Sequence, residues 1–97
     1  MKVEVFINEF RKTNKNCELK YLNGFCYCFY EILKKQYPRA IPYYSPIQCH
    51  VVTKIDDKFY DIRGKLGKNQ LKELELIPYE KVNKKIKEGL EKRNSNT

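Results

Sequence analysis

Three residues of this sequence have the side chains that acyl-transfer chemistry needs: Cys26, His50 and Asp61. A thiol becomes a nucleophile when a neighbouring imidazole takes its proton, and a carboxylate can hold that imidazole in the required tautomer. His50 is the only histidine of the chain, which makes it the one candidate imidazole base. The chain order Cys, His, Asp is one arrangement in which such triads recur on unrelated folds. We therefore predict a Cys–His–Asp catalytic site.

The residues around Cys26 predict a helix that begins just before the thiol. Asn23 is a favourable N-cap, and apolar residues follow at helical spacing as far as Pro38, so we expect a helix over about residues 24–36. The unpaired N–H groups and the positive dipole end of such a helix favour a thiolate. The alternative role for Cys26 is that of a small residue of the core.

An acyl-transfer site also needs donors for the oxyanion that forms on the substrate. The backbone N–H of Cys26 can supply one donor at the helix start, and the side-chain amide of Asn23 is the candidate for a second. Capping is the competing role of Asn23, whose side chain would then bind the N–H of Phe25 or Cys26.

Predicted strands bring His50 and Asp61 near each other. Residues 48–55 and 58–62 are rich in β-formers and flank an Asp-Asp pair, which predicts a hairpin. With a two-residue turn, Val52 faces Asp61, and His50 lies diagonally from Asp61 on the same face of the sheet. A three-residue turn would place His50 and Asp61 on opposite faces. The alternatives to a catalytic pair are a half-exposed strand histidine and a solvated strand-end carboxylate.

The remaining elements must position this site. Apolar residues spaced i, i+3, i+4 and i+7 predict an amphipathic helix over residues 2–13. Residues 17–22 are expected to form a connector whose Leu19, Tyr21 and Leu22 cover the core.

Prolines punctuate the chain after the Cys-bearing helix. Those at positions 38, 42 and 46 restrict residues 40–44 to an edge strand at most. Residues 71–77 fit either a short helix or a strand. Pro78 is expected to begin a last helix, in which apolar residues recur every four positions, before a frayed tail over residues 93–97.

Length and composition limit the class of protein. The 97 residues suit a single domain with one core, over residues 1–92. With 41% hydrophobic and 33% charged residues, the chain is too apolar for a disordered protein and too charged for a membrane protein. The longest uncharged apolar run, residues 25–30, is far shorter than the roughly 20 residues that span a bilayer. Glu4 stands where a signal peptide would be apolar, so we expect a protein of the cytoplasm.

Neither a metal nor another cofactor is expected. Cys26 and Cys28 are two residues apart, so on a helix their thiols would point roughly 200° apart. Cys49 and His50 would likewise alternate across a strand. Zinc sites prefer ligands with two or more residues between them. In a reducing cytoplasm the four cysteines, Cys17 included, are expected to be free thiols.

The net charge of +8 allows two kinds of partner. Nucleic acid is the less favoured, because the excess is mostly lysine spread along the chain and the arginines do not alternate with aromatic residues. An acidic protein fits such a surface better, and eight tyrosines supply amphipathic contact area. We expect a host protein as substrate or partner, no membrane contact, and a monomer or weak homodimer.

Three segments of the chain resemble a known family. They are Asn-Gly-Phe-Cys-Tyr-Cys-Phe at residues 23–29, His-Val-Val at 50–52 and Phe-Tyr-Asp-Ile-Arg-Gly at 59–64. These segments resemble a family of small phage and prophage proteins, which in turn is similar to the papain-like and transglutaminase-like cysteine hydrolase fold. The resemblance covers roughly residues 3–66. It implies Cys26 as nucleophile, His50 as base and Asp61 as the orienting carboxylate.

The sequence thus predicts an α+β fold with a Cys-bearing helix on a small antiparallel sheet and helices at both ends, as in a minimal papain-like core. The leading functional hypothesis is a phage-type cysteine-dependent peptidase, amidase or deamidase that acts in the host cytoplasm through Cys26, His50 and Asp61. The alternative is a non-catalytic phage accessory protein that binds and inhibits a host or defence protein.

Overall fold

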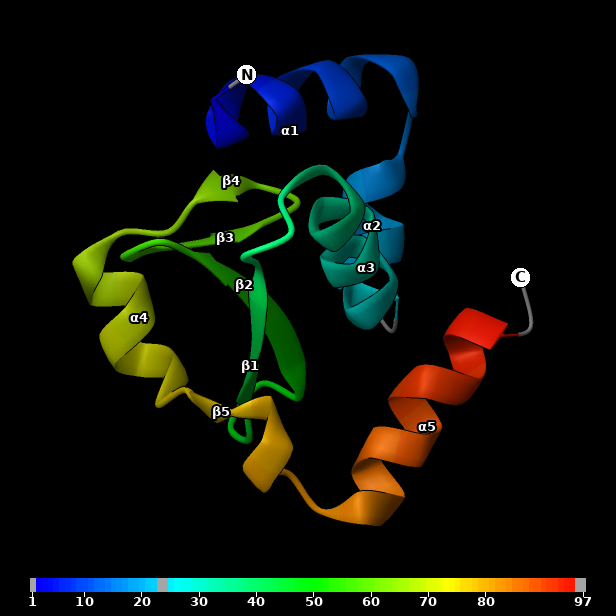
Figure 1. Ribbon diagram of the computed structural model, residues 1–97, viewed down its shortest axis with the longest axis vertical. Helices are drawn as coiled ribbons and strands as arrows, with labels where there is room; N and C mark the ends of the chain where they lie inside the picture. Colours follow the sequence, from blue (N-terminus) through cyan, green and yellow to red (C-terminus); the bar gives the residue numbers. More distant parts are fainter. Residues whose placement is uncertain (1, 23–24, 96–97) are drawn as a thin grey trace.

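A five-stranded antiparallel sheet forms the centre of the computed structural model, which describes residues 2–22 and 25–95 (Figure 1). The strand order is β4-β3-β2-β1-β5. The elements in chain order are α1 (Val3–Thr13), α2 (Cys17–Leu22), α3 (Cys26–Gln36), β1 (Ile41–Ser45), β2 (His50–Ile55), β3 (Lys58–Asp61), β4 (Gly64–Lys65), α4 (Lys68–Leu74), β5 (Ile77–Pro78), the 3₁₀ helix η1 (Tyr79–Lys81) and α5 (Lys84–Ser95). The predicted α+β fold is confirmed.

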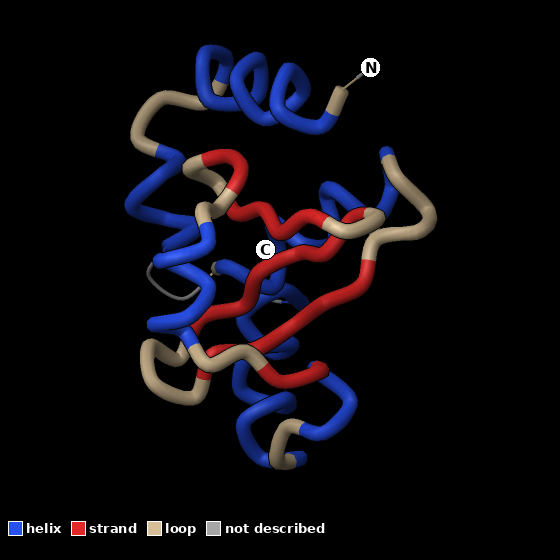
Figure 2. The backbone as a smooth tube through the Cα atoms, turned by 90° about the vertical axis from the view of Figure 1, so that its left-hand side faces the viewer, coloured by secondary structure: helices blue, strands red, loops and turns tan. Residues whose placement is uncertain are grey.

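Helices cover both faces of the sheet. The first three helices lie on one side and α4 lies on the other, as Figure 1 shows. In Figure 2 the strands run through the molecule with helices around them. The largest buried cluster joins α1, α2 and α3 to the strands β2 and β3, through Ile7, Cys17, Phe29, Leu33, Ile55 and Tyr60. The helix that carries Cys26 therefore packs directly against the sheet.

Two predicted helices form where their apolar spacing placed them. Helix α1 buries Ile7 on its apolar stripe, and α3 buries Phe29 and Leu33. Phe25 is the N-cap residue of α3 and its backbone is not helical, so the helix begins at Cys26. The predicted cap, Asn23, lies outside the described residues.

The β2–β3 hairpin has the two-residue turn. Ile55 pairs with Lys58 and Thr53 with Tyr60, which is the register that keeps His50 and Asp61 on one face. Asp56 supports the tight turn with a φ of 58°, a left-handed conformation that Asp tolerates better than most residues. Strand β2 begins at His50, two residues later than predicted, because residues 46–49 form a turn.

The segment at residues 17–22 is a helix, so the predicted connector was wrong. Helix α2 buries Cys17, and Tyr21 and Leu22 pack against the large core cluster. Leu19 was also expected to cover the core but is 68% exposed. On a helix Leu19 points away from the side that its neighbours bury, which an irregular connector would not have required.

Strand β1 is not an edge strand, which corrects the prediction made from its prolines. It pairs with β2 along its whole length and with β5 through Tyr43 and Tyr44. Strand β5 is only two residues long, so Pro42 lies beyond its end and removes no hydrogen bond from that ladder. The edge position belongs to Pro78, in β5, where a missing N–H is tolerated.

The carboxy-terminal segment forms two helical pieces rather than one helix from Pro78. Pro78 precedes the short helix η1, and Val82 then takes an extended conformation with ψ 145°. The side chain of Asn83 accepts the N–H of Lys85 at 2.8 Å, which caps the start of α5. The ambiguous residues 71–77 also divide, with α4 ending at Leu74 and β5 beginning at Ile77. Helix α5 continues to Ser95.

No helix in the described ranges is long and apolar enough to cross a lipid bilayer.

Leu33 should be a main determinant of stability, because it is fully buried between α3 and the sheet. We expect Leu33→Ala to lower the free energy of unfolding by about 3 kcal/mol through lost burial and a residual cavity. Leu19→Ala is the matched control and should change it by less than about 0.5 kcal/mol, since Leu19 is 68% exposed. Urea denaturation followed by circular dichroism measures both, and equal losses would contradict the packing described.

Candidate active site

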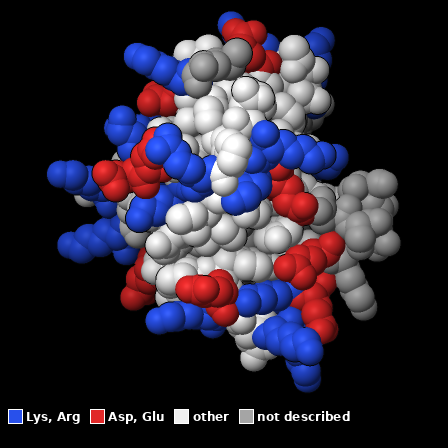
Figure 3. All heavy atoms as spheres, in the orientation of Figure 1, with Lys and Arg blue, Asp and Glu red and all other residues white. Residues whose placement is uncertain are grey.

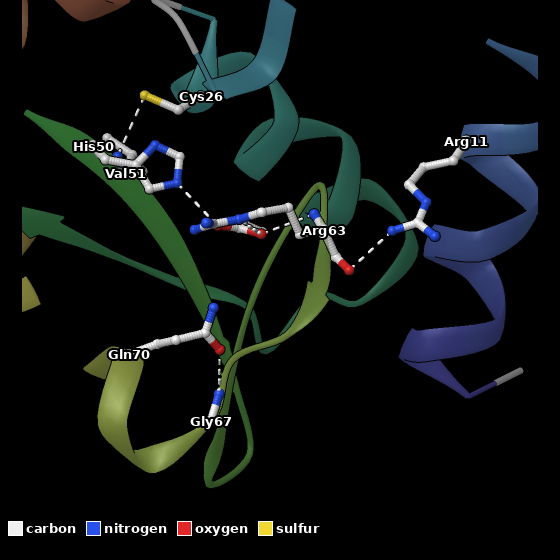
Figure 4. Close-up of polar contacts among 8 residues, drawn as sticks. Arg11, Cys26, His50, Val51, Arg63, Gly67 and Gln70 are labelled. Carbon is white, nitrogen blue, oxygen red and sulfur yellow. Dashed lines mark hydrogen bonds and ion pairs between the residues drawn. The ribbon is translucent and has the colours of Figure 1, made fainter. Parts of the chain in front are cut away.

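The three residues predicted to carry chemistry lie at the ends of three elements that meet at one corner of the sheet. Cys26 is the first residue of α3, His50 is the first residue of β2 and Asp61 is the last residue of β3. Figure 4 shows the imidazole of His50 between the Cys26 thiol and the side chain of Arg63. All three residues are buried, with exposed fractions of 3%, 4% and 2%.

The end of the β2–β3 ladder creates the place for the thiol. The backbone N–H groups of Thr53 and Ile55 point toward β3. N–H direction alternates from one residue to the next along a strand, so the N–H of Val51 points toward the same side. Strand β3 has ended at this height, so the N–H of Val51 donates to the Sγ of Cys26 at 3.3 Å instead. The sulfur thus occupies a position where a further strand residue would have accepted that bond.

Asp61 accepts hydrogen bonds on both carboxylate oxygens. Its Oδ2 lies 3.1 Å from Nε2 of His50. The backbone N–H of Arg63 donates to Oδ1 at 2.8 Å, and the Arg63 guanidinium donates to Oδ2 from Nε at 3.1 Å and from Nη2 at 2.6 Å. The sequence analysis did not predict a role for Arg63. The available signal was an Arg two residues after the candidate Asp. A buried carboxylate needs such partners, because burying an unpaired charge is costly.

The other imidazole nitrogen of His50, Nδ1, lies on the side of Cys26 (Figure 4). Since Nε2 bonds to the carboxylate, Nδ1 remains for the thiol. Nδ1 is fully buried and makes no hydrogen bond of ordinary geometry to any described residue. A buried polar atom without a partner is uncommon and calls for a functional or structural reason.

The electrostatics of this corner favour a thiolate and an imidazolium. Burial alone would raise the pKa of Cys26, but the imidazole of His50 and the N–H of Val51 outweigh it and lower that pKa from 9.0. Burial would lower the pKa of His50, but the bond to Asp61 and the interaction with Cys26 raise it from 6.5 to about 9. The pKa of Asp61 is lowered, against its burial, by His50 and Arg63.

These opposite pKa shifts give the two contributions to folding stability opposite pH dependences. The His50 contribution is fully present below pH 6.5 and is lost as the pH rises through about 9. The Cys26 contribution is present above pH 9.0 and is lost as the pH falls through the lowered thiol pKa. As the pH rises from 6.5 toward 9, the loss of the His50 contribution is therefore opposed by the gain of the Cys26 contribution.

Apolar and aromatic side chains cover the thiol. Cys26 packs with Tyr44, Val51, Tyr79 and Val82, and Leu90 of α5 lies against the same cluster. Tyr79 and Val82 come from η1 and the residue that follows it, so the carboxy-terminal segment closes over the thiol. The alternative role of Cys26 as a core residue is therefore compatible with its burial.

The proposed oxyanion donor Asn23 lies outside the described residues. All four cysteines lie inside them, and none forms a disulfide. Among the described residues, no group of three or more His, Cys, Asp and Glu side chains is arranged to hold a metal ion.

Comparison with known proteins identifies a family. The family described as Phage YunG-like protein matches residues 4–95 of the chain. No curated protein matches the chain. No solved structure matches it either.

The single histidine allows a direct test of the site's electrostatics. In the wild type, the imidazole of His50 should titrate near pH 9 in an NMR experiment. Asp61→Asn should lower that pKa by about one unit or more, because it removes a negative charge bonded to Nε2. Asp56→Asn is the matched control at an exposed turn of the same hairpin and should leave the titration unchanged. A wild-type imidazole that titrates near 6.5 would be inconsistent with the arrangement.

Proposed function

The chain belongs to the phage YunG-like protein family, and we propose that it is a cysteine-dependent acyl hydrolase or transferase that acts in the host cytoplasm. In this proposal Cys26 is the nucleophile, His50 the general base and acid, and Asp61 the carboxylate that orients the imidazole. A distant kinship with papain-like and transglutaminase-like hydrolases belongs to the same proposal. The observation that carries it is the buried Nδ1 of His50, which faces Cys26 and has no hydrogen-bond partner among residues 2–22 and 25–95, while Nε2 is held by Asp61.

The geometry suits a two-step acyl transfer. The Cys26 thiolate attacks the carbonyl carbon of an amide, and a C–S bond forms as the carbonyl oxygen becomes an oxyanion. The imidazolium of His50 gives its Nδ1 proton to the leaving nitrogen as the C–N bond breaks, which leaves a thioester on Cys26. Neutral His50 then takes a proton from water, or from an acceptor amine. The new nucleophile attacks the thioester, the C–S bond breaks and the thiolate returns.

Substrate access requires movement of the segment that covers Cys26. A nucleophile that is 3% exposed cannot meet a protein substrate without displacement of Tyr79 or Val82. Tyr79 is held by contact with the ring of Tyr27 and by its hydroxyl, 3.4 Å from a carboxylate oxygen of Glu91. Tyr79 is also 7% exposed and packs in the buried cluster around Cys26, so opening of this segment must break these contacts.

The covered thiol also favours a second candidate function. A phage accessory protein that binds and inhibits a host or defence protein would keep this fold without needing an accessible nucleophile. The net charge of +8 suits an acidic partner, although Lys and Arg are interspersed with Asp and Glu over the face in Figure 3. The two functions differ in what happens to the partner.

A host-lysate experiment separates the two functions. The wild type, Cys26→Ala and His50→Ala, all checked for native circular dichroism, are incubated with lysate, and host proteins are analysed by mass spectrometry. We expect a host protein to change mass through lost or exchanged acyl or amide groups, with the change reduced by roughly 100-fold or more in both variants. Cys49→Ala removes an exposed thiol next to His50 in the sequence, and this variant should still modify the host protein. A stable complex with an unmodified host protein, unaffected by Cys26→Ala, would instead support the binding function.

Removal of the covering aromatic ring should expose the thiol. Tyr79→Ala should raise the rate at which iodoacetamide alkylates Cys26 by about tenfold, measured by peptide mapping with exposed Cys49 as internal reference. Tyr21→Ala, which alters the packing of α2 against Phe29, is the control and should have little effect on that rate. An unchanged rate in Tyr79→Ala would show that the segment at residues 79–82 does not limit access.

A further inference from the structure

We propose that Arg63 is a positioning residue that holds the Asp61 carboxylate against His50 and supplies the fourth charge of the site. This inference rests on the proposed function, in which a Cys26 thiolate is the attacking group. Arg63 touches neither Cys26 nor His50 through any hydrogen bond found between described residues, so it acts through Asp61.

Arg63 donates hydrogen bonds to the Asp61 carboxylate from both its backbone and its side chain. Its backbone N–H and its guanidinium both bond to Asp61, from a turn in which Asp61 pairs with Gly64. Gly64 has a φ of 113°, which side-chain-bearing residues rarely adopt, so the turn has a specific backbone geometry. The carbonyl of Arg63 in turn accepts Nη1 of Arg11 at 2.9 Å, which ties the turn to α1. The carboxylate can therefore rotate little about its own side-chain bonds.

The charges along this line alternate in sign. The thiolate of Cys26, the imidazolium of His50, the carboxylate of Asp61 and the guanidinium of Arg63 sum to zero. Without the guanidinium the buried corner would carry a net negative charge, which a desolvated site tends to neutralise by binding a proton. The thiolate is the group that accepts that proton most readily, so loss of Arg63 moves thiolate formation to higher pH.

The other titratable groups around the site do not replace this charge. Tyr44 of β1 and Tyr79 of η1 interact with Cys26, and both have pKa values raised by burial, so they are neutral near pH 7. Cys28 on α3 and Cys49 before β2 are thiols. Beyond them, Glu91 of α5 faces Tyr79, while Glu18 of α2 lies near Arg63 and pairs with Arg11 at 3.7 Å. Among the described residues, Arg63 is the cation besides the His50 imidazolium that is in direct contact with the Asp61 carboxylate.

The test compares Arg63→Met, Arg63→Gln and Arg63→Lys with Arg39→Met. Arg39 pairs with Asp56 at an exposed position of the same hairpin, so its loss removes an equal charge from the protein but not from the site. Formation of the Cys26 thiolate is followed by ultraviolet absorbance, corrected with Cys26→Ser, and His50 is followed by NMR. We expect the thiolate midpoint to rise by about one pH unit in Arg63→Met and Arg63→Gln, by less in Arg63→Lys, and not at all in Arg39→Met.

The outcomes distinguish this inference from the proposed function. A thiolate midpoint at the wild-type pH in a folded Arg63→Met would overturn the role of Arg63, with the proposed function intact. If Arg63→Met does not fold, Arg63→Gln decides: it keeps a polar side chain that can donate to the carboxylate but removes the charge, so an unshifted midpoint again overturns the inference. Ordinary wild-type titrations of Cys26 and His50 would count against the proposed function, whatever the variants show.

Discussion

The buried carboxylate of Asp61 is the group on which the rest of the site depends. It is 2% exposed, and a charge at that depth is tolerated only when hydrogen bonds and opposite charges surround it. Its partners organise three parts of the molecule: His50 at the start of β2, the turn that leads through Arg63 into β4, and, through Arg11, helix α1. The acid therefore links the local geometry of the hairpin to the helical layer.

Much of the site could be predicted from local patterns, and what could not be predicted depends on distant contacts. The hairpin register that places His50 and Asp61 on one face of the sheet follows from the two-residue spacing between the β-rich segments. Arg63 gave only a weak signal, since an Arg two residues after an Asp is common and its direction depends on the turn at Gly64. The packing of Tyr79 and Val82 over Cys26 could not be predicted from the sequence, because it depends on how a segment more than 50 residues away folds back.

The errors in the predicted fold have the same origin. Prolines in residues 40–46 predicted an edge strand, but the neighbour on that side, β5, is too short to need the missing donor of Pro42. Leu19 looked like a core residue by type, yet the helix that forms at residues 17–22 turns it outward. In both cases the residue type was read correctly, and the deciding factor was the length or geometry of an element formed elsewhere.

The two-residue turn of the β2–β3 hairpin also sets an order of assembly for the site. His50 and Asp61 are separated by 11 positions, whereas the contact between Cys26 and Val51 closes a loop of 25. Short loops close at lower entropic cost and hairpins form within microseconds, so we expect the imidazole and carboxylate to meet before α3 docks. In that order the thiol reaches a base that is already oriented, and its reactivity depends on the last of these contacts to form.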